Sequence, residues 1–113
     1  MHEMALMAEV FDIIKQYTAG ISDNKVIKVT LVVGELTNAV PVALESAFEV
    51  FSGGTNVEGA VLEIKAVPLT SICIGCGWEG KIEKHSFICP NCSSLEMEVK
   101  TGRELYVESL EVE

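Results

Sequence analysis

Cys73-Ile74-Gly75-Cys76 and, twelve residues further on, Cys89-Pro90-Asn91-Cys92 hold all four cysteines of this chain. Two Cys-x-x-Cys pairs at this separation suit a tetrahedral zinc ion, because each pair can form a tight turn that points two sulfurs at the metal. Gly75 and Gly77 permit positive φ around the first turn, and Pro90 fixes φ in the second. The spacing therefore predicts a zinc ribbon, in which the segment between the pairs is long enough for a short hairpin.

The same four thiols are compatible with other chemistry. They can form two disulfides, one pair can act as a redox dithiol, and four cysteines can also hold iron in a rubredoxin-like centre. Zinc is favoured because two matched pairs satisfy one metal and nothing in the sequence suggests secretion. A catalytic zinc needs an open coordination position, which four cysteines do not leave, so the zinc should be structural. Its binding then stabilises the fold by about 10 to 16 kcal/mol, as in zinc-finger peptides.

The length and composition indicate a small folded protein. The chain has 113 residues, which is the size of one domain with room for an inserted module. A hydrophobic fraction of 49% supports a core, yet no run approaches the roughly 18 apolar residues of a membrane span. Glu3, Glu9 and Asp12 interrupt the only candidate for a signal peptide, so none is expected. The expected location is therefore cytoplasmic.

The balance of charge excludes some partners. Eight Lys and Arg stand against 17 Asp and Glu, which gives a net charge of −9. Nucleic acid is not expected as a partner, because phosphate binding needs clustered cations. Cations, metal ions and basic protein surfaces are compatible with such a charge. The sequence contains no Gly-rich phosphate loop, nucleophile elbow or HExxH pattern, so the chain is not expected to be an enzyme.

Hydrophobic periodicity predicts a small α+β fold. The expected elements follow in the order helix 4–17, strand 25–33, helix 41–52, strand 60–67, cysteine-bearing segment 70–98 and strand 104–112. A change of phase at Ser109 is compatible with a β-bulge in the last strand. We therefore expect a small three-stranded sheet with two helices and an inserted four-cysteine zinc-ribbon module. The expected domains are residues 1–69 plus 99–113 and the zinc-binding module 70–98.

The expected buried faces follow from the same periods. In the first helix, the apolar residues at three- and four-residue steps should face the core, and they are Met7, Val10, Phe11, Ile14 and Tyr17. The methionines at 4 and 7 should pack there too rather than serve as soft metal ligands. In strand 25–33, Ile27, Val29, Leu31 and Val33 alternate with the intervening side chains, so we expect one well-buried face.

The chain begins Met1-His2-Glu3, which is a possible chelator. The α-amine of Met1, the backbone nitrogen of His2 and the His2 imidazole can place three nitrogens around one ion. A fourth donor can come from the Glu3 backbone, the Glu3 carboxylate or another chain, which completes the square-planar set that suits Ni(II) or Cu(II). Acid should release the metal, because the amine and imidazole must lose protons to bind. The alternative is that His2 is an ordinary surface residue.

Several segments together resemble one known family. They are the opening Met1-His2-Glu3-Met4, the segment from Gly34-Glu35-Leu36 through Val40-Pro41 to Ala47-Phe48-Glu49, both cysteine pairs, and the ending from Gly102-Arg103-Glu104-Leu105 to Glu111-Val112. In this order, over nearly the full length, they are similar to the HypA (HybF) family of nickel metallochaperones for [NiFe]-hydrogenase maturation.

The resemblance implies a protein with two metal sites. Ni(II), as cargo, would be held at the amino terminus by Met1, His2 and Glu3, within the domain formed by 1–69 plus 99–113. Structural Zn(II) would be held by Cys73, Cys76, Cys89 and Cys92. Proteins of this family deliver nickel to the hydrogenase large subunit together with the GTPase HypB, and some also serve urease. The sequence does not predict the oligomeric state.

One departure from the family concerns the residues after each cysteine pair. Members often carry histidine there, whereas Gly77 and Ser93 follow the pairs in this chain. An exchange of a cysteine ligand for a histidine ligand at the zinc is therefore less expected in this chain. His85, in the segment between the two pairs, is the one histidine whose side chain could approach the metal. Two other classes remain as alternatives, a zinc-ribbon adaptor and a thiol redox enzyme, and the acidity of the chain argues against the first.

Overall fold

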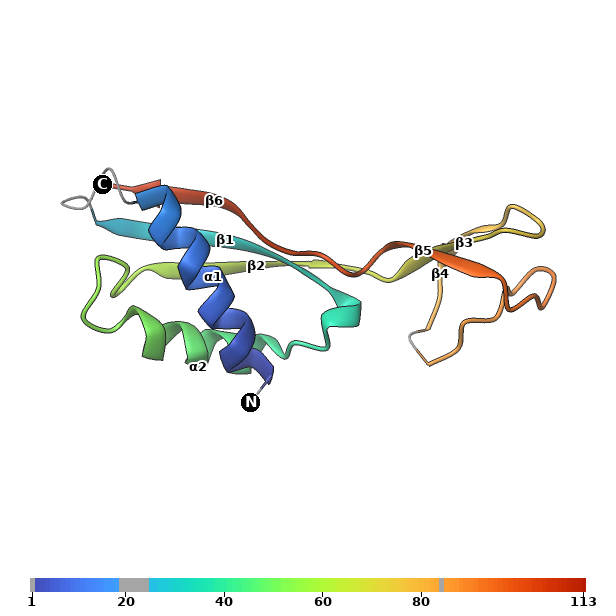
Figure 1. The fold of residues 1–113 in the computed structure, drawn as a ribbon, viewed down its shortest axis with the longest axis horizontal. Helices are drawn as coiled ribbons and strands as arrows, with labels where there is room; N and C mark the ends of the chain where they lie inside the picture. The colour runs from blue at the N-terminus through green and yellow to red at the C-terminus, as the bar shows by residue number, and fades with distance from the viewer. Residues whose placement is uncertain (1, 19–24, 84) are drawn as a thin grey trace. The chain divides into compact units, whose positions relative to one another are not determined.

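The structure, a computed structural model, describes residues 2–18, 25–83 and 85–113 (Figure 1). Its elements in chain order are α1 (His2–Thr18), β1 (Val26–Gly34), the short 3-10 helix η1 (Glu35–Thr37), α2 (Pro41–Ser52), β2 (Val61–Val67), β3 (Thr70–Cys73), β4 (Glu79–Lys81), β5 (Met97–Thr101) and β6 (Leu105–Val112). The predicted α+β class is confirmed: two helices accompany a three-stranded sheet, and the inserted cysteine-bearing segment adds a second three-stranded sheet.

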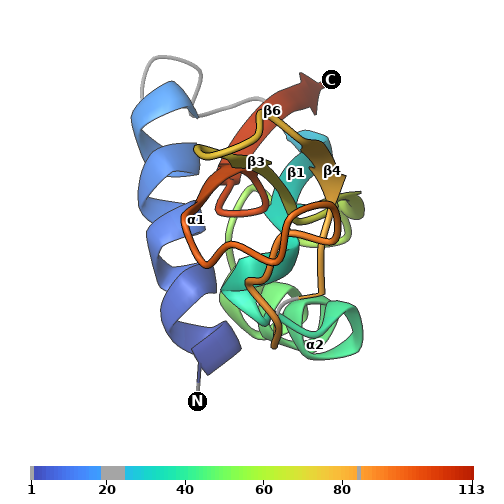
Figure 2. The ribbon, with the colours of Figure 1, turned by 90° about the vertical axis from the view of Figure 1, so that its right-hand side faces the viewer.

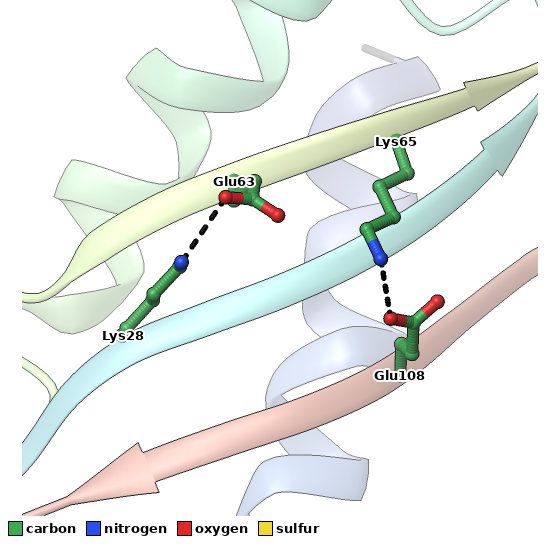
Figure 3. A network of polar contacts seen from close by, with 4 residues as sticks. All are labelled: Lys28, Glu63, Lys65 and Glu108. Atoms are coloured by element: carbon green, nitrogen blue, oxygen red, sulfur yellow. Dashed lines mark hydrogen bonds and ion pairs between the residues drawn. The ribbon is translucent and has the colours of Figure 1, made fainter.

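The first sheet has the strand order β2-β1-β6. The arrows of β1 and β2 point the same way in Figure 3, and that of β6 points the opposite way. Two neighbouring parallel strands need a crossover connection, and α2 supplies it between β1 and β2. The sheet thus contains one unit of strand, helix and strand, and the last strand of the chain pairs with the other edge of β1.

The two helices pack against each other and form the larger core. The ring of Phe11 on α1 lies 5.6 Å from the rings of both Phe48 and Phe51 on α2, measured between centroids. The predicted core face of the first helix is confirmed for Met7, Val10, Phe11 and Ile14, which are all buried. It is wrong for Tyr17, which lies in the last turn of α1 and is 71% exposed. Met7 has no exposed surface and is a core residue.

Strand β1 is buried more completely than the sequence predicts. Val29, Leu31 and Val33 are buried as expected, but Thr30 and Val32 on the alternate face are buried as well, because β1 is the central strand. The expectation for Ile27 is wrong, since 42% of this residue is exposed. At that end of the strand the buried side chain is Val26, whose backbone N–H donates to the carbonyl of Asn56 in the turn after α2.

Ion pairs connect the three strands of the first sheet on one face (Figure 3). Lys28 on β1 pairs with Glu63 on β2 at 3.1 Å, and Lys65 on β2 pairs with Glu108 on β6 at 2.7 Å. The hydrogen bond that the Lys65 ammonium group donates to the Glu108 carboxylate raises the pKa of Lys65. Both pairs are partly exposed to water, so they add little stability and act mainly to favour one alignment of the strands.

The second sheet has the order β4-β3-β5, with both pairings antiparallel. Its strands β3 and β4 are labelled in Figure 2. Ile72 of β3 lies opposite Glu79 of β4 on one side and Glu98 of β5 on the other. The hairpin formed by β3 and β4 therefore encloses the first cysteine pair, whereas the sequence suggested a hairpin between the two pairs. The β-bulge suggested at Ser109 stays a prediction.

The chain forms two compact units, residues 1–32, 39–65 and 106–113 (unit 1) and residues 33–38 and 66–105 (unit 2). Unit 1 contains α1, α2 and most of the first sheet, and unit 2 contains the second sheet and all four cysteines. The expected division into domains, 1–69 plus 99–113 and 70–98, stays a prediction, because a compact unit is not by itself a segment that folds alone. Among the described residues, no helix is long and apolar enough to cross a membrane.

Two segments that carry the family resemblance meet inside unit 2. The N–H groups of Gly34 and Leu36 donate to the carbonyls of Glu104 and Gly102, both at 2.7 Å. A side chain on Gly34 would overlap the carbonyl group of Gly102, so only glycine allows the two backbones to approach so closely. The Glu35 carboxylate also accepts a hydrogen bond from the N–H of Leu69 at 3.1 Å. These contacts hold together the strands from which the cysteine-bearing segment emerges.

Candidate metal centre

The four cysteines converge in unit 2. Their sulfur atoms all lie within 4.8 Å of one another, and the distances from Cys73 to Cys92 and from Cys76 to Cys89 are 3.6 Å. A tetrahedral zinc ion with Zn–S bonds of about 2.3 Å would place its sulfurs about 3.8 Å apart. A disulfide would need about 2.05 Å, and all four cysteines are free. The sulfur positions therefore fit one metal ion of the size of zinc.

The two cysteine turns have the same backbone hydrogen bonds. In the first turn, the N–H of Cys73 donates to Trp78, and the N–H of Gly77 donates back to Cys73. The corresponding bonds of the second turn run from Cys89 to Ser94 and from Ser93 to Cys89. All four bonds measure between 2.7 and 2.9 Å. Each turn is thus closed by its own backbone hydrogen bonds and presents two sulfurs toward the other turn.

Further N–H groups point at the sulfurs. The backbone N–H of Cys76 lies 3.5 Å from the sulfur of Cys73, and that of Cys92 lies 3.4 Å from the sulfur of Cys89. Such donors stabilise negative charge on sulfur. The two turns thus direct one such donor each at the sulfur cluster, where a bound metal ion would find negatively charged ligands.

The residue after each cysteine pair has the left-handed conformation. Gly77 has φ +82° and Ser93 has φ +63°. The expectation of positive φ is confirmed for Gly77 but does not hold for Gly75, which is not among the residues with positive φ. Ser93 is the residue that sequence reasoning missed, and the available signal was its position, which is equivalent to that of Gly77. A non-glycine residue rarely adopts this conformation, so the backbone of the second turn is strained at Ser93.

The thiols of Cys76 and Cys92 differ in their readiness to ionise. The side-chain amide of Asn91, 3.4 Å from the sulfur of Cys76, lowers the pKa of this thiol to about 6, with help from the backbone at Trp78. For Cys92, the backbone at Ser94 lowers the pKa, but the neighbouring sulfurs, Cys73 first, raise it to about 12. Four sulfurs this close cannot all carry charge unless a cation lies among them. A divalent metal removes that conflict.

His85 does not belong to this cluster, which holds the four cysteines alone. Its side chain is exposed and lines a hollow of about 670 Å³ in unit 2 together with Lys81, Ile88 and Pro90. The structure therefore gives His85 no place among the four sulfur ligands.

The amino-terminal candidates are only partly described. Met1 and the side chain of His2 lie outside the described residues, so the predicted nickel ligands stay a prediction. Helix α1 begins at His2, and the carboxylate of Glu3 accepts a hydrogen bond of 3.2 Å from the backbone N–H of Val40. Val40 is the N-cap residue of α2 and makes no side-chain cap bond of its own. Glu3 therefore joins the first turn of α1 to the start of α2.

Known proteins similar to this chain come from one family. The sequence pattern of the family described as "Hydrogenase/urease nickel incorporation, metallochaperone, hypA" matches residues 1–112. Hydrogenase maturation factor HypA of Desulfitobacterium hafniense (strain DSM 10664 / DCB-2) is 44% identical over 113 residues, which cover 100% of this chain and 99% of the relative. Hydrogenase maturation factor HypA of Lawsonia intracellularis (strain PHE/MN1-00) is 41% identical over 118 residues, with 100% of both chains covered.

Solved structures give the same fold. The solution structure of the Ni metallochaperone HypA from Helicobacter pylori matches with a TM-score of 0.69 and 24% sequence identity. The match covers 98% of this chain and 97% of that chain. At this identity the likeness concerns the fold alone.

Proposed function

This chain belongs to the HypA family of metallochaperones for nickel incorporation into hydrogenase and urease, and we propose that it holds Ni(II) as cargo at its own amino terminus. We propose further that one structural Zn(II) occupies the four-cysteine site. The function is the binding and transfer of a metal ion during [NiFe]-hydrogenase maturation, without a catalysed reaction. The observation that carries the proposal is the family match, which begins at the Met1-His2-Glu3 terminus.

The nickel donors are the α-amine of Met1, the backbone nitrogen and imidazole of His2, and a group of Glu3. The start of α1 at His2 supports this set, because the first N–H groups of a helix have no acceptor within the helix. The backbone nitrogen of His2 can then bind metal without the loss of a helical hydrogen bond. Glu3 has its carboxylate close to the N–H of Val40, which supports a role in fixing the terminus against α2.

Zn(II) is the metal proposed for Cys73, Cys76, Cys89 and Cys92. The convergence of four sulfurs within 4.8 Å and the N–H groups directed at them support this assignment. Four cysteines leave no open position for a substrate, so the ion has a structural role. The exposed thiol of Cys76, whose pKa is lowered, would be oxidised easily without metal, which supports a reducing, cytoplasmic location.

The proposed partners are the GTPase HypB and the hydrogenase large subunit, with urease as a second client. The family description, which names hydrogenase and urease nickel incorporation, supports the clients. The net charge of −9 supports association with basic protein surfaces rather than with nucleic acid.

An anaerobic calorimetric titration with Ni(II) tests the nickel site on untagged, zinc-loaded protein. Wild type should bind one nickel per chain, and His2→Ala should lose this binding with its zinc content unchanged. The matched control is His85→Ala, because His85 is the only other histidine in the sequence, and it should bind both metals like wild type. If His2→Ala still binds nickel, the amino-terminal site is wrong, and a zinc-ribbon adaptor becomes the better description.

A further inference from the structure

Large apolar side chains lie exposed around the cysteine turns of unit 2. The exposed fractions are 63% for Ile74, 76% for Leu95, 47% for Ile88 and 36% for Phe87. Ile74 lies inside the first cysteine pair, and Phe87 and Ile88 immediately precede the second. Single exposed apolar residues are ordinary on protein surfaces, whereas a group of them beside a rigid site indicates a surface for another molecule.

Backbone hydrogen bonds place these residues near one another. The N–H of Ile74 donates to the carbonyl of Glu96, the neighbour of Leu95, at 2.9 Å. The N–H of Cys89, the neighbour of Ile88, donates at 2.9 Å to Ser94, which precedes Leu95. The backbone of Leu95 therefore lies between the two segments that carry Ile74 and Ile88. We call Ile74, Phe87, Ile88 and Leu95 the apolar tip.

The segment that carries the apolar tip is rich in acidic side chains. Glu96 follows Leu95 directly, and Glu79 and Glu98 lie opposite Ile72 on the two neighbouring strands. The only cation paired with these residues in the described structure is Lys100, whose ammonium group lies 3.2 Å from the Glu79 carboxylate. Segment 70–98 holds four Glu and two Lys, and a zinc ion with four thiolates would add about two further negative charges.

We propose that the apolar tip is a docking surface for a partner protein that presents an apolar patch with a basic rim. A second copy of this chain is the wrong occupant, because two copies of this acidic segment would repel each other and the net charge of each copy is −9. The hollow of about 670 Å³ beside the tip, lined by Ile88 and Pro90, can receive a side chain of the partner. The metal holds the tip in place, since the turns that carry Ile74 and Leu95 also carry the thiolates.

The proposal rests on the proposed function only for the identity of the proteins used to test it. The test variant is Ile74→Ser with Leu95→Ser, which leaves every cysteine in place. The matched control is Val42→Ser with Val50→Ser on α2, because these valines are exposed to a similar extent, 70% and 67%, but lie in unit 1. Binding of each variant to the immobilised GTPase HypB and to the immobilised hydrogenase large subunit is measured by interferometry, at low and high salt.

The tip variant should bind one of these proteins about tenfold or more weakly than wild type, while the control stays within about twofold. High salt should slow association of the wild type, because complementary charge accelerates encounter. Zinc and nickel contents measured on each variant separate lost docking from lost folding and from a failure of the nickel site.

Three results would overturn the proposal. The first is that the tip variant binds as tightly as the control. The second is that wild type binds neither protein while it still binds nickel. The third is that wild type forms a dimer in analytical ultracentrifugation and the tip variant does not, in which case the occupant is a second copy. Loss of nickel binding with docking retained would instead remove the proposed function and leave the docking surface standing.

Discussion

Gly77 and Ser93 occupy equivalent left-handed positions, and their exchange for other residues should change zinc affinity in opposite directions. The left-handed conformation costs a residue with a Cβ atom about 1 to 2 kcal/mol. Gly77→Ala should therefore weaken zinc binding by about tenfold, since about 1.4 kcal/mol corresponds to a factor of ten. Ser93→Gly should strengthen it, by a smaller factor because glycine also loses more freedom on folding. Competition with a chromogenic chelator measures both changes.

Gly75→Ala is the control for that pair. Gly75 is not among the residues with positive φ, and a Cβ atom there would lie 3.8 Å from the sulfur of Cys73, which is an ordinary contact. Zinc affinity should then stay close to that of wild type. Equal losses in Gly75→Ala and Gly77→Ala would show that any side chain in the first turn harms the site, and that backbone conformation is not the cause.

Ser71 on β3 has a buried hydroxyl without a hydrogen-bond partner among the described residues. An unsatisfied buried polar group costs about 1 to 3 kcal/mol. Ser71→Ala should therefore raise the free energy of unfolding of zinc-loaded protein by about 1 kcal/mol, measured by urea denaturation.

The neighbouring Thr70 provides the contrast. Its hydroxyl lies 2.6 Å from that of Thr101, so Thr70→Val removes a hydrogen bond and should lower the free energy of unfolding by about 1 kcal/mol. If Ser71→Ala is destabilising too, the Ser71 hydroxyl has a partner such as a bound water molecule.

At the scale of elements, the contact between the end of β1 and the turn before β6 should tolerate no side chain. Gly34→Ala would force a methyl group into the carbonyl of Gly102, and neither backbone can give way without breaking the paired hydrogen bonds. We expect a loss of about 3 kcal/mol or more in the free energy of unfolding.

Gly53→Ala is the matched control, because the nearest atom to a Cβ there is 3.7 Å away and φ is −55°. Its effect should stay within about 0.5 kcal/mol. Urea denaturation followed by circular dichroism compares the two variants. A mild effect of Gly34→Ala would mean that the two backbones can separate at little cost.

The elements that the sequence predicts well are those long enough to show a regular hydrophobic periodicity. Helix 41–52 matches α2 residue for residue, because Pro41 marks its start and the pair Gly53-Gly54 marks its end. The three strands of the first sheet are each predicted within one residue of their ends. Strands β3 and β4 have four and three residues, too few for a periodic signal, and they depend on pairing and on the metal turns.

The candidate site was predictable to the same extent. The four cysteines follow from spacing alone, and the structure brings their sulfurs together. Three features of the site could not be predicted from the sequence, because each depends on how distant or irregular segments meet. They are the left-handed conformation of Ser93, the contact of the Asn91 amide with Cys76 and the hydrogen bond from Val40 to Glu3. The exposure of Ile27 was missed for a similar reason, since the alternation of a strand does not say how far the covering layer extends.

At the scale of the whole molecule, the two units differ in how much core they possess. Among the described residues, all the buried apolar side chains lie in unit 1 except those of Val33, Leu69, Cys73 and Cys89. A unit with so small a core depends on its metal for stability, because metal binding then supplies folding free energy. Unit 1 has the aromatic packing between α1 and α2 and needs no such help.

Removal of zinc should therefore unfold unit 2 and leave unit 1 folded. Two signals separate the units, because the only tryptophan, Trp78, lies in unit 2 and both α-helices of the described structure lie in unit 1. A strong chelator should shift Trp78 fluorescence toward that of an exposed indole while the helical far-ultraviolet ellipticity is retained. Cys92→Ser should behave in the same way before any chelator is added. If ellipticity falls together with the fluorescence change, the units fold as one, and the metal supports unit 1 as well as unit 2.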